Sequence, residues 1–151
     1  MSKFSLTLNA ENIAGQIAKL LNDGGQLWAY IHPNLILTNS IRYIIELDRE
    51  TVIGVVGLEQ QSPKVTEMKH LCVHPNYRCR GLGRKLLEKG LKATSTEFVY
   101  GAVRSDNATN IRNNLRIGML PIGKKRGSWG CHIIIFARRT NSESRVHSGR
   151  A

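Results

Sequence analysis

The strongest constraint on the fold is one stretch near the middle of the chain, where a strand pattern passes through a glycine turn into a helix pattern. The strand pattern ends at Val73, glycines follow at Gly81 and Gly83, and the leucines after them recur at helical spacing. The first amides of a helix have no partners within it, and the helix dipole adds partial positive charge there. Glycine also lets a ligand approach the backbone closely. The stretch therefore predicts a site for an anion such as a phosphate.

The charge distribution supports an anionic ligand or partner. The 151 residues carry a formal net charge of +11. Residues 1–77 hold 6 Lys and Arg against 7 Asp and Glu, whereas residues 78–151 hold 16 against 4. The basic half thus begins at the glycine turn, where Arg78, Arg80 and Arg84 add full charges. This asymmetry predicts a basic face that meets an anionic ligand, a nucleic acid or an acidic protein, and it disfavours a cationic substrate.

Length and composition predict one globular domain, residues 1–137, followed by a basic, disordered tail, residues 138–151. No apolar run has the length of a membrane span, and the N-terminus lacks the apolar core of a signal peptide. Three cysteines form no C-x-x-C pair and leave an odd thiol, which favours a reducing compartment over a disulfide framework or a structural zinc site. We therefore expect a cytoplasmic protein that uses no metal and binds no membrane.

The periodicity of apolar residues predicts a mixed α/β domain around a single sheet. The expected strands are residues 3–8, 41–47, 51–59, 65–73, 97–104, 119–122 and 131–137. The expected helices are residues 9–24, 82–93 and 107–117. Residues 26–40 are expected to form a short helix and then a loop or strand, with Pro33 interrupting the apolar pattern.

Two familiar phosphate-binding motifs do not fit the glycine turn. A Walker A loop needs G-x-x-x-x-G-K-[ST], which the spacing does not match. A dinucleotide fingerprint needs a third glycine where Leu86 stands. It also needs an acidic residue about 20 positions later, at the end of a second strand, and none stands there.

A third pattern fits. The segment Arg78-Cys79-Arg80-Gly81-Leu82-Gly83 is similar to the R/Q-x-x-G-x-G/A motif of the GNAT superfamily of N-acetyltransferases. Downstream, Asp106-Asn107-Ala108 followed by Gly118-Met119 resembles that family's N-x-x-A … G-F helix. The resemblance covers residues 41–137 and implies a mostly antiparallel sheet of six or seven strands flanked by helices. It also implies an acetyl-CoA-dependent N-acetyltransferase in which a primary amine attacks directly.

The resemblance also implies how acetyl-CoA is held. Its pyrophosphate would contact amides of the glycine turn, and its pantetheine arm would contact amides at the end of the preceding strand. The implied cofactor-binding residues are Leu71, Cys72, Val73, Arg78, Arg80, Gly81, Leu82, Gly83, Arg84 and Asn107. Considered without the resemblance, the arginines equally fit a solvated basic loop, and Asn107 fits a helix N-cap.

Two side chains on the strand before the turn are candidates for the general base. Glu67 stands where some protein-acetylating members carry a catalytic glutamate, and His70 has a suitable intrinsic pKa. His74 shares that intrinsic pKa, but its place next to Pro75 is more typical of a loop residue. Many members also carry a tyrosine as general acid, four residues before the glycine of the second motif. Asn114 occupies that position in this chain and cannot donate a titrating proton.

Other groups could supply the missing acid. The alternatives are Tyr77, Tyr100, Ser105, Ser128 and water. A covalent route through Cys79, which lies between two arginines near a helix N-terminus, is a further alternative.

The last hairpin is expected to end in a long basic tip, residues 123–130, and the resemblance implies that this hairpin borders the acceptor. Lys124, Lys125, Arg126 and Trp129 combine positive charge with an aromatic ring, which suits a nucleic acid or an acidic peptide. We therefore expect a macromolecular or anionic acceptor, either protein or nucleic-acid-associated. The alternatives are a small-molecule amine as acceptor, or a basic nucleic-acid-binding protein without catalysis. The resemblance also implies a homodimer.

Overall fold

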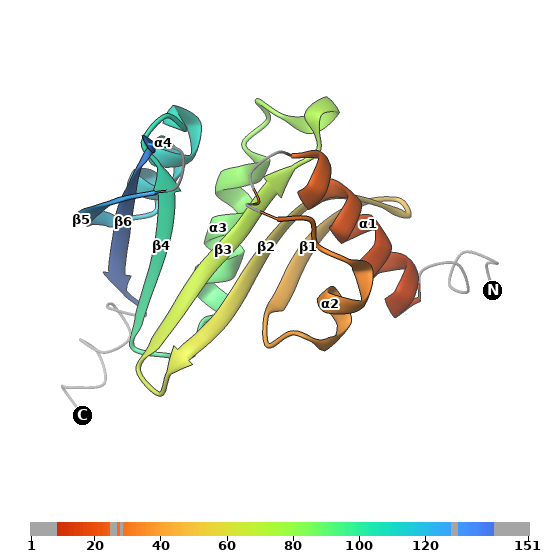
Figure 1. Ribbon diagram of the computed structural model, residues 1–151, viewed down its shortest axis with the longest axis horizontal. Helices are drawn as coiled ribbons and strands as arrows, with labels where there is room; N and C mark the ends of the chain where they lie inside the picture. The colour runs from red at the N-terminus through yellow and green to blue at the C-terminus, as the bar shows by residue number, and fades with distance from the viewer. Residues whose placement is uncertain (1–8, 25–26, 28, 128–129, 141–151) are drawn as a thin grey trace.

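One sheet of six strands forms the centre of the molecule (Figure 1). The computed structural model describes residues 9–24, 27, 29–127 and 130–140. The strands are β1 (Arg42–Asp48), β2 (Thr51–Ser62), β3 (Val65–Val73), β4 (Phe98–Arg104), β5 (Leu120–Arg126) and β6 (His132–Arg139). Their order is β1-β2-β3-β4-β6-β5, and among them only β3 and β4 pair in parallel. The expected α/β fold with a mostly antiparallel sheet is confirmed.

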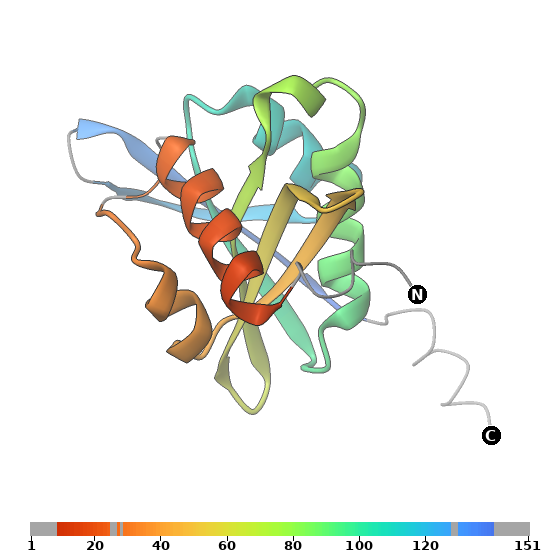
Figure 2. The same ribbon diagram turned by 90° about the vertical axis from the view of Figure 1, so that its right-hand side faces the viewer.

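Helices cover the two faces of the sheet unequally (Figures 1 and 2). On the front face of Figure 1, α1 (Ala10–Asp23) and α2 (Pro33–Thr38) lie over the half of the sheet that contains β1, β2 and β3. On the opposite face lie α3 (Leu82–Ala93) and α4 (Ala108–Arg116). No helix of the described residues covers the front of β4, β6 and β5, so this part of the sheet stays open.

The helix boundaries follow from local chemistry. α1 begins after Asn9, whose side chain accepts a hydrogen bond from the Asn12 amide at 2.8 Å, and Gly24 caps its end. α2 begins at Pro33, and the N–H that proline lacks would have no partner within the helix at this first position. The proline that was expected to interrupt this region therefore starts its helix.

Two apolar clusters fix the helices on the sheet. The front cluster joins α1 to the strands through residues such as Ile17, Leu21 and Val55. The back cluster contains Leu86 of α3 and Phe136 of β6, which are both fully buried. In the part of the chain that the structure describes, no helix has the length and apolar content needed to cross a membrane.

The last hairpin differs from the sequence-based expectation. β5 continues to Arg126, so the three basic residues pair with β6 instead of forming a loop tip. Opposed residues of an antiparallel pair share a face, so Lys125 faces the open front with Ile133. Lys124 and Arg126 therefore face the opposite side. Trp129 and the expected strand at residues 3–8 lie outside the described residues.

Three buried threonines close one end of the sheet. Thr66 on β3 and Thr96 share a hydrogen bond between their hydroxyl groups at 2.7 Å. The hydroxyl of Thr140 donates to the carbonyl oxygens of Thr96 and Glu97. β6 extends to Arg139, so the expected domain boundary after residue 137 falls inside a strand. Apolar periodicity missed this end because hydrogen bonds, rather than apolar contacts, accompany the burial of Thr140.

We therefore expect two truncated chains to show whether the folded domain ends after residue 137 or after residue 140. A chain that ends after residue 140 should unfold at nearly the same urea concentration as the full chain. A chain that ends after residue 137 should lose about 1 kcal/mol of unfolding free energy for each hydrogen bond removed, roughly 2 kcal/mol or more in total. Equal unfolding midpoints for the two truncated chains would contradict a stabilising role of residues 138–140.

Candidate active site

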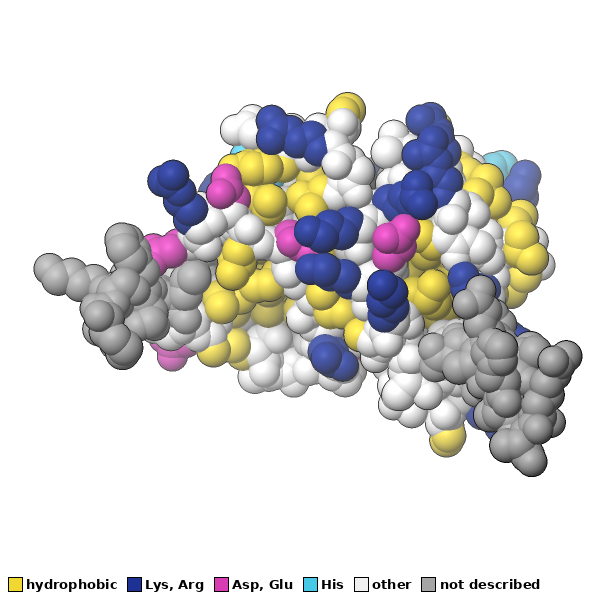
Figure 3. All heavy atoms as spheres, turned by 180° about the vertical axis from the view of Figure 1, so that it is seen from behind, with side chains coloured by type: hydrophobic (Ala, Val, Ile, Leu, Met, Phe, Trp, Pro, Cys, Tyr) yellow, Lys and Arg dark blue, Asp and Glu magenta, His cyan; other side chains and the backbone are white. Residues whose placement is uncertain are grey.

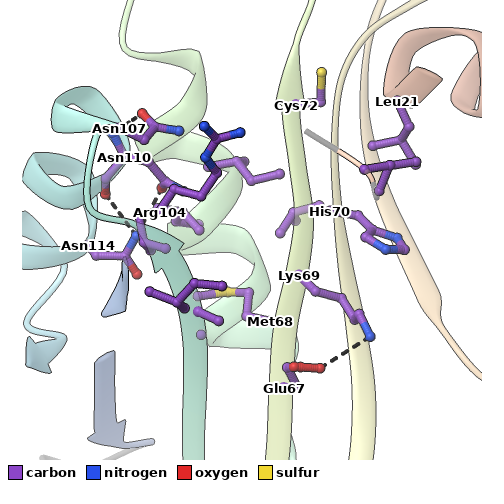
Figure 4. A pocket seen from close by; sticks show the side chains of 18 residues that line it. Leu21, Glu67, Met68, Lys69, His70, Cys72, Arg104, Asn107, Asn110 and Asn114 are labelled. Carbon is purple, nitrogen blue, oxygen red and sulfur yellow. Dashed lines mark hydrogen bonds and ion pairs between the residues drawn. The ribbon is translucent and has the colours of Figure 1, made fainter. Parts of the chain in front are cut away.

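β3 and β4 part soon after they meet. Their parallel pairing joins residues 65–67 to residues 98–100 only. β3 then contains a β-bulge, in which His70 and Leu71 together face the single residue Val56 of β2. His70 adopts a left-handed φ of 57° within the bulge. The bulge bends β3, and a gap opens between it and β4 (Figure 4).

Two adjoining cavities occupy the region of this gap. The smaller, of about 320 Å³, is lined by β3, by β4 and by the end of α1. The larger, of about 540 Å³, is bordered by the glycine turn and by α4. Four residues line both cavities: Leu71, Cys72, Asn107 and Asn110. The cavities therefore share a wall formed by the end of β3 and the start of α4.

The glycine turn presents free backbone donors to the larger cavity. Gly81 has a φ of 76°, a conformation that glycine adopts without strain. The amide of Lys85 donates to the carbonyl oxygen of Gly81 at 3.0 Å, so the amides of residues 82–84 precede the first bond of the helix. α4 packs closely here, because a Cβ added to Gly83 would lie 3.2 Å from Asn113 Nδ2.

The three arginines of the turn have different surroundings. Arg78 lines the larger cavity, and its Nε donates to the carbonyl oxygen of the last β3 residue at 3.1 Å. The guanidinium of Arg80 lies over the Tyr77 ring, and Arg84 pairs with Glu88 on its own helix at 2.9 Å. The expected contacts of Arg80 and Arg84 therefore depend on their backbone amides.

α4 adds two cations that the sequence reasoning did not assign to the site. Arg112 and Arg116 lie one turn apart and both line the larger cavity, together with Thr109. Figure 3, seen from behind, shows Lys and Arg side chains on the face of the molecule that carries α3 and α4. The i, i+4 spacing of the two arginines was visible in the sequence and places them on one face of the helix. Only the packing of α4 beside the glycine turn shows that this face borders the larger cavity.

The end of β3 directs its amides alternately. The amide of His74 donates to the carbonyl oxygen of Ile53 at 2.8 Å. The alternation of an antiparallel ladder therefore points the Val73 N–H toward the gap and the Cys72 N–H toward β2. The Cys72 thiol is buried, its Sγ contacts the carbonyl oxygen of Leu20 at 3.4 Å, and burial raises its pKa. A buried, protonated thiol is a poor nucleophile.

Asparagines organise the opposite wall of the gap. Asn107 caps α4 by accepting a hydrogen bond from the Asn110 amide at 3.1 Å. Asn114 is buried, and its Nδ2 donates to the backbone oxygen of Asn110 at 2.8 Å and to Asn110 Oδ1 at 2.9 Å (Figure 4). Both amide hydrogens of Asn114 are therefore bonded within α4, which gives this side chain a structural role.

The two candidate bases both line the smaller cavity (Figure 4). Glu67 forms an ion pair with Lys69, with 3.2 Å between Oε1 and Nζ. His70 places Nδ1 3.0 Å from the hydroxyl oxygen of Tyr43. Burial and, to a smaller extent, the charge of Lys69 lower the pKa of His70. His70 is therefore an uncharged imidazole at neutral pH.

The remaining candidates are less well placed. The Tyr77 hydroxyl donates to the carboxylate of Asp48. Burial and the nearby Glu67 carboxylate raise the pKa of Tyr100, so its phenol stays protonated. Cys79 is exposed and borders the larger cavity, and Ser128 lies outside the described residues. Among the described residues, no group of three or more His, Cys, Asp or Glu is arranged to hold a metal ion.

Comparison with known proteins decides the family. The acetyltransferase (GNAT) family matches residues 16–118, about two thirds of the chain. This chain belongs to the GNAT family of acetyltransferases. An uncharacterised protein of Mycobacterium leprae is 30% identical over 112 residues, which cover 72% of this GNAT chain and 31% of the relative. The chain thus spans about a third of the length of that relative.

Solved GNAT structures share the fold. A ribosomal-protein alanine N-acetyltransferase from Escherichia coli aligns with a TM-score of 0.73 at 14% identity, over 88% of this chain and 90% of that one. A putative acetyltransferase from Salmonella typhimurium, solved with its cofactor acetyl-CoA, aligns with a TM-score of 0.70 at 16% identity, over 88% and 89%. The expected family and fold are therefore confirmed.

The surroundings of His70 in this acetyltransferase predict a titration. We expect its imidazole to titrate below the ordinary value of about 6.5. The unfolded chain would then bind this proton at a higher pH than the folded chain, so acidification below about pH 6.5 should lower the free energy of unfolding. Ring resonances in an NMR titration would report the midpoint, and His70→Gln would identify the signal. A midpoint at or above 6.5 would contradict the assignment.

Proposed function

We propose that this acetyltransferase uses acetyl-CoA and transfers the acetyl group to a primary amine by direct attack. The observation that supports this most directly is the pair of adjoining cavities. One is bordered by free helix amides and arginines, and the other by candidate proton acceptors. An anionic acetyl donor and an amine could therefore meet at the shared wall, with no covalent intermediate on the protein.

The larger cavity suits the anionic part of acetyl-CoA. The free amides of residues 82–84 and the guanidinium groups of Arg78, Arg112 and Arg116 could together bind phosphate groups. The Val73 N–H points into the gap, where it could donate to the pantetheine arm or to the thioester carbonyl. Acetyl-CoA supplies an acetyl group that is activated as a thioester.

We assign the proton of the attacking amine to His70. With its own proton on Nδ1, the imidazole donates to the Tyr43 hydroxyl and leaves the Nε2 lone pair available. The amine nitrogen bonds to the acetyl carbon as the carbon–sulfur bond breaks. The leaving thiolate takes a proton from solvent, because the Asn114 carboxamide carries no titrating proton.

We further propose a macromolecular, anionic acceptor. The open front of β4, β6 and β5 supports this (Figure 1). The strand register places Ile133 and Ile135 on this face, with Arg104, Lys125 and Arg139 around them. An apolar strip with a cationic rim suits a polypeptide that carries acidic side chains.

Cofactor binding can be tested directly. Millimolar acetyl-CoA should raise the melting temperature, because a ligand that binds only the folded state stabilises it. The double variant Arg112→Glu and Arg116→Glu should weaken binding by roughly tenfold or more in calorimetry, since charge-assisted contacts contribute about 1.5–3 kcal/mol each. Lys92→Glu makes the same kind of charge change at the far end of α3 and should bind normally. An unshifted melting temperature, or equal losses in both variants, would contradict the proposed cofactor site.

The acceptor can be identified by label transfer. Incubation with radiolabelled acetyl-CoA and cell lysate should place the label on acid-precipitable macromolecules. Transfer should fall several-fold in Lys125→Glu and Arg139→Glu and at high salt, which screens exposed charges. Lys92→Glu again serves as the control. Label only on small amines would exclude the macromolecular acceptor, and cofactor binding without any transfer would favour a binding protein.

A further inference from the structure

Lys69 stands beside both candidate bases on the same strand (Figure 4). Its Nζ lies 3.2 Å from Glu67 Oε1 on β3 and 3.3 Å from Glu59 Oε1 on β2. Glu59 is held in turn by the Ser40 hydroxyl at 2.6 Å and by the Gln61 side-chain amide at 3.0 Å. One ammonium group therefore bridges two carboxylates at the edge of the smaller cavity.

This ion-pair network is more than a surface contact. The side chains of Lys69, Glu59 and Glu67 are only 30%, 23% and 17% exposed, so water screens their charges less than it screens those of a free surface pair. Burial acts to lower the pKa of Lys69, but the two carboxylates outweigh it and the pKa rises. The cation is therefore permanent under physiological conditions.

The ammonium changes what Glu67 can do. A carboxylate oxygen that accepts a hydrogen bond from a cation has that lone pair engaged, and the contact must break before the oxygen can take a proton. Glu67 borders the smaller cavity, yet one of its oxygens is bonded to Lys69. Glu67 is therefore positioned as a base would be, but its ion pair with Lys69 disfavours that role.

The same charge acts on His70. The groups that face this imidazole are Tyr43 from β1, Glu59 from β2, and Lys69 and Glu67 from β3. The two carboxylates favour protonation of the ring, whereas burial and the ammonium disfavour it. The second pair of effects prevails, so the imidazole keeps a lone pair at neutral pH.

We propose that Lys69 is a positioning residue that withdraws Glu67 from proton transfer and leaves His70 as the group that takes the proton from the acceptor amine. This inference rests on the proposed N-acetyltransfer. It adds that Lys69, without touching the substrate, determines which of the two candidate bases accepts the proton.

The effect of His70→Gln in two backgrounds tests the proposal. With Lys69 present, this substitution should lower kcat/KM by about 100-fold, the lower range for loss of a general base. In the Lys69→Met background the same substitution should cost several-fold less, because the ion pair no longer engages Glu67 and its remaining partner is the Tyr100 hydroxyl. Glu67→Gln should show the reverse pattern, with a small effect beside Lys69 and a larger one beside Met.

The pH dependence supplies a second readout. Lys69→Met should move the acid limb of the kcat/KM profile and the NMR titration of His70 to higher pH, and Lys69→Arg should restore both. Lys89→Met removes a cation on the other face of the sheet and should change neither. The NMR titration needs no substrate, so it tests the coupling even in a variant that is inactive.

The outcomes separate this inference from the proposed function. If the full chain transfers no acetyl group, the proposed function fails. If transfer occurs but His70→Gln costs the same with and without Lys69, or if the His70 titration does not move in Lys69→Met, the positioning role of Lys69 is wrong.

Discussion

The parting of β3 from β4 is the geometric condition on which the cleft depends. Paired strands hydrogen-bond their N–H and C=O groups to each other. If β3 and β4 were paired along their whole length, no ligand could lie between them. Here the pairing stops at Glu67, and the bulge at His70 and Leu71 bends the strand away. The left-handed φ of His70 is a strained conformation for this residue, and its hydrogen bond to Tyr43 helps to hold it. The feature that opens the cleft therefore also places the imidazole beside it.

Positive charges lie both at the larger cavity and inside the cleft, and the net charge does not distinguish these two locations. Arg78, Arg112 and Arg116 of the basic half line the larger cavity, which is the side proposed to bind the cofactor. Inside the cleft, Lys69 is matched by two carboxylates. The net charge of +11 is therefore a weak guide to the acceptor. The open front face, with Lys125 at its rim, is the more specific indication.

Much of the fold could be predicted from the sequence because its signals are local. The helix after Gly81 and the cap at Asn107 depend on neighbouring residues, and both are present as expected. The misjudged parts depend on distant contacts. Thr140 is buried by hydrogen bonds to the segment before β4, which apolar periodicity cannot register. The ion pair that joins Glu67 to Lys69 was equally invisible, because a sequence shows a carboxylate two residues from a lysine without showing that both turn toward Glu59.

The threonine cluster has a mechanical consequence for the cleft. Thr66, Thr96 and Thr140 tie β3, β4 and the end of β6 together at the end where the two parallel strands still touch. From that point β3 and β4 diverge. The threonine hydrogen bonds thus hold β3 and β4 together at the end from which the two strands diverge toward the proposed meeting point of the amine and the acetyl donor.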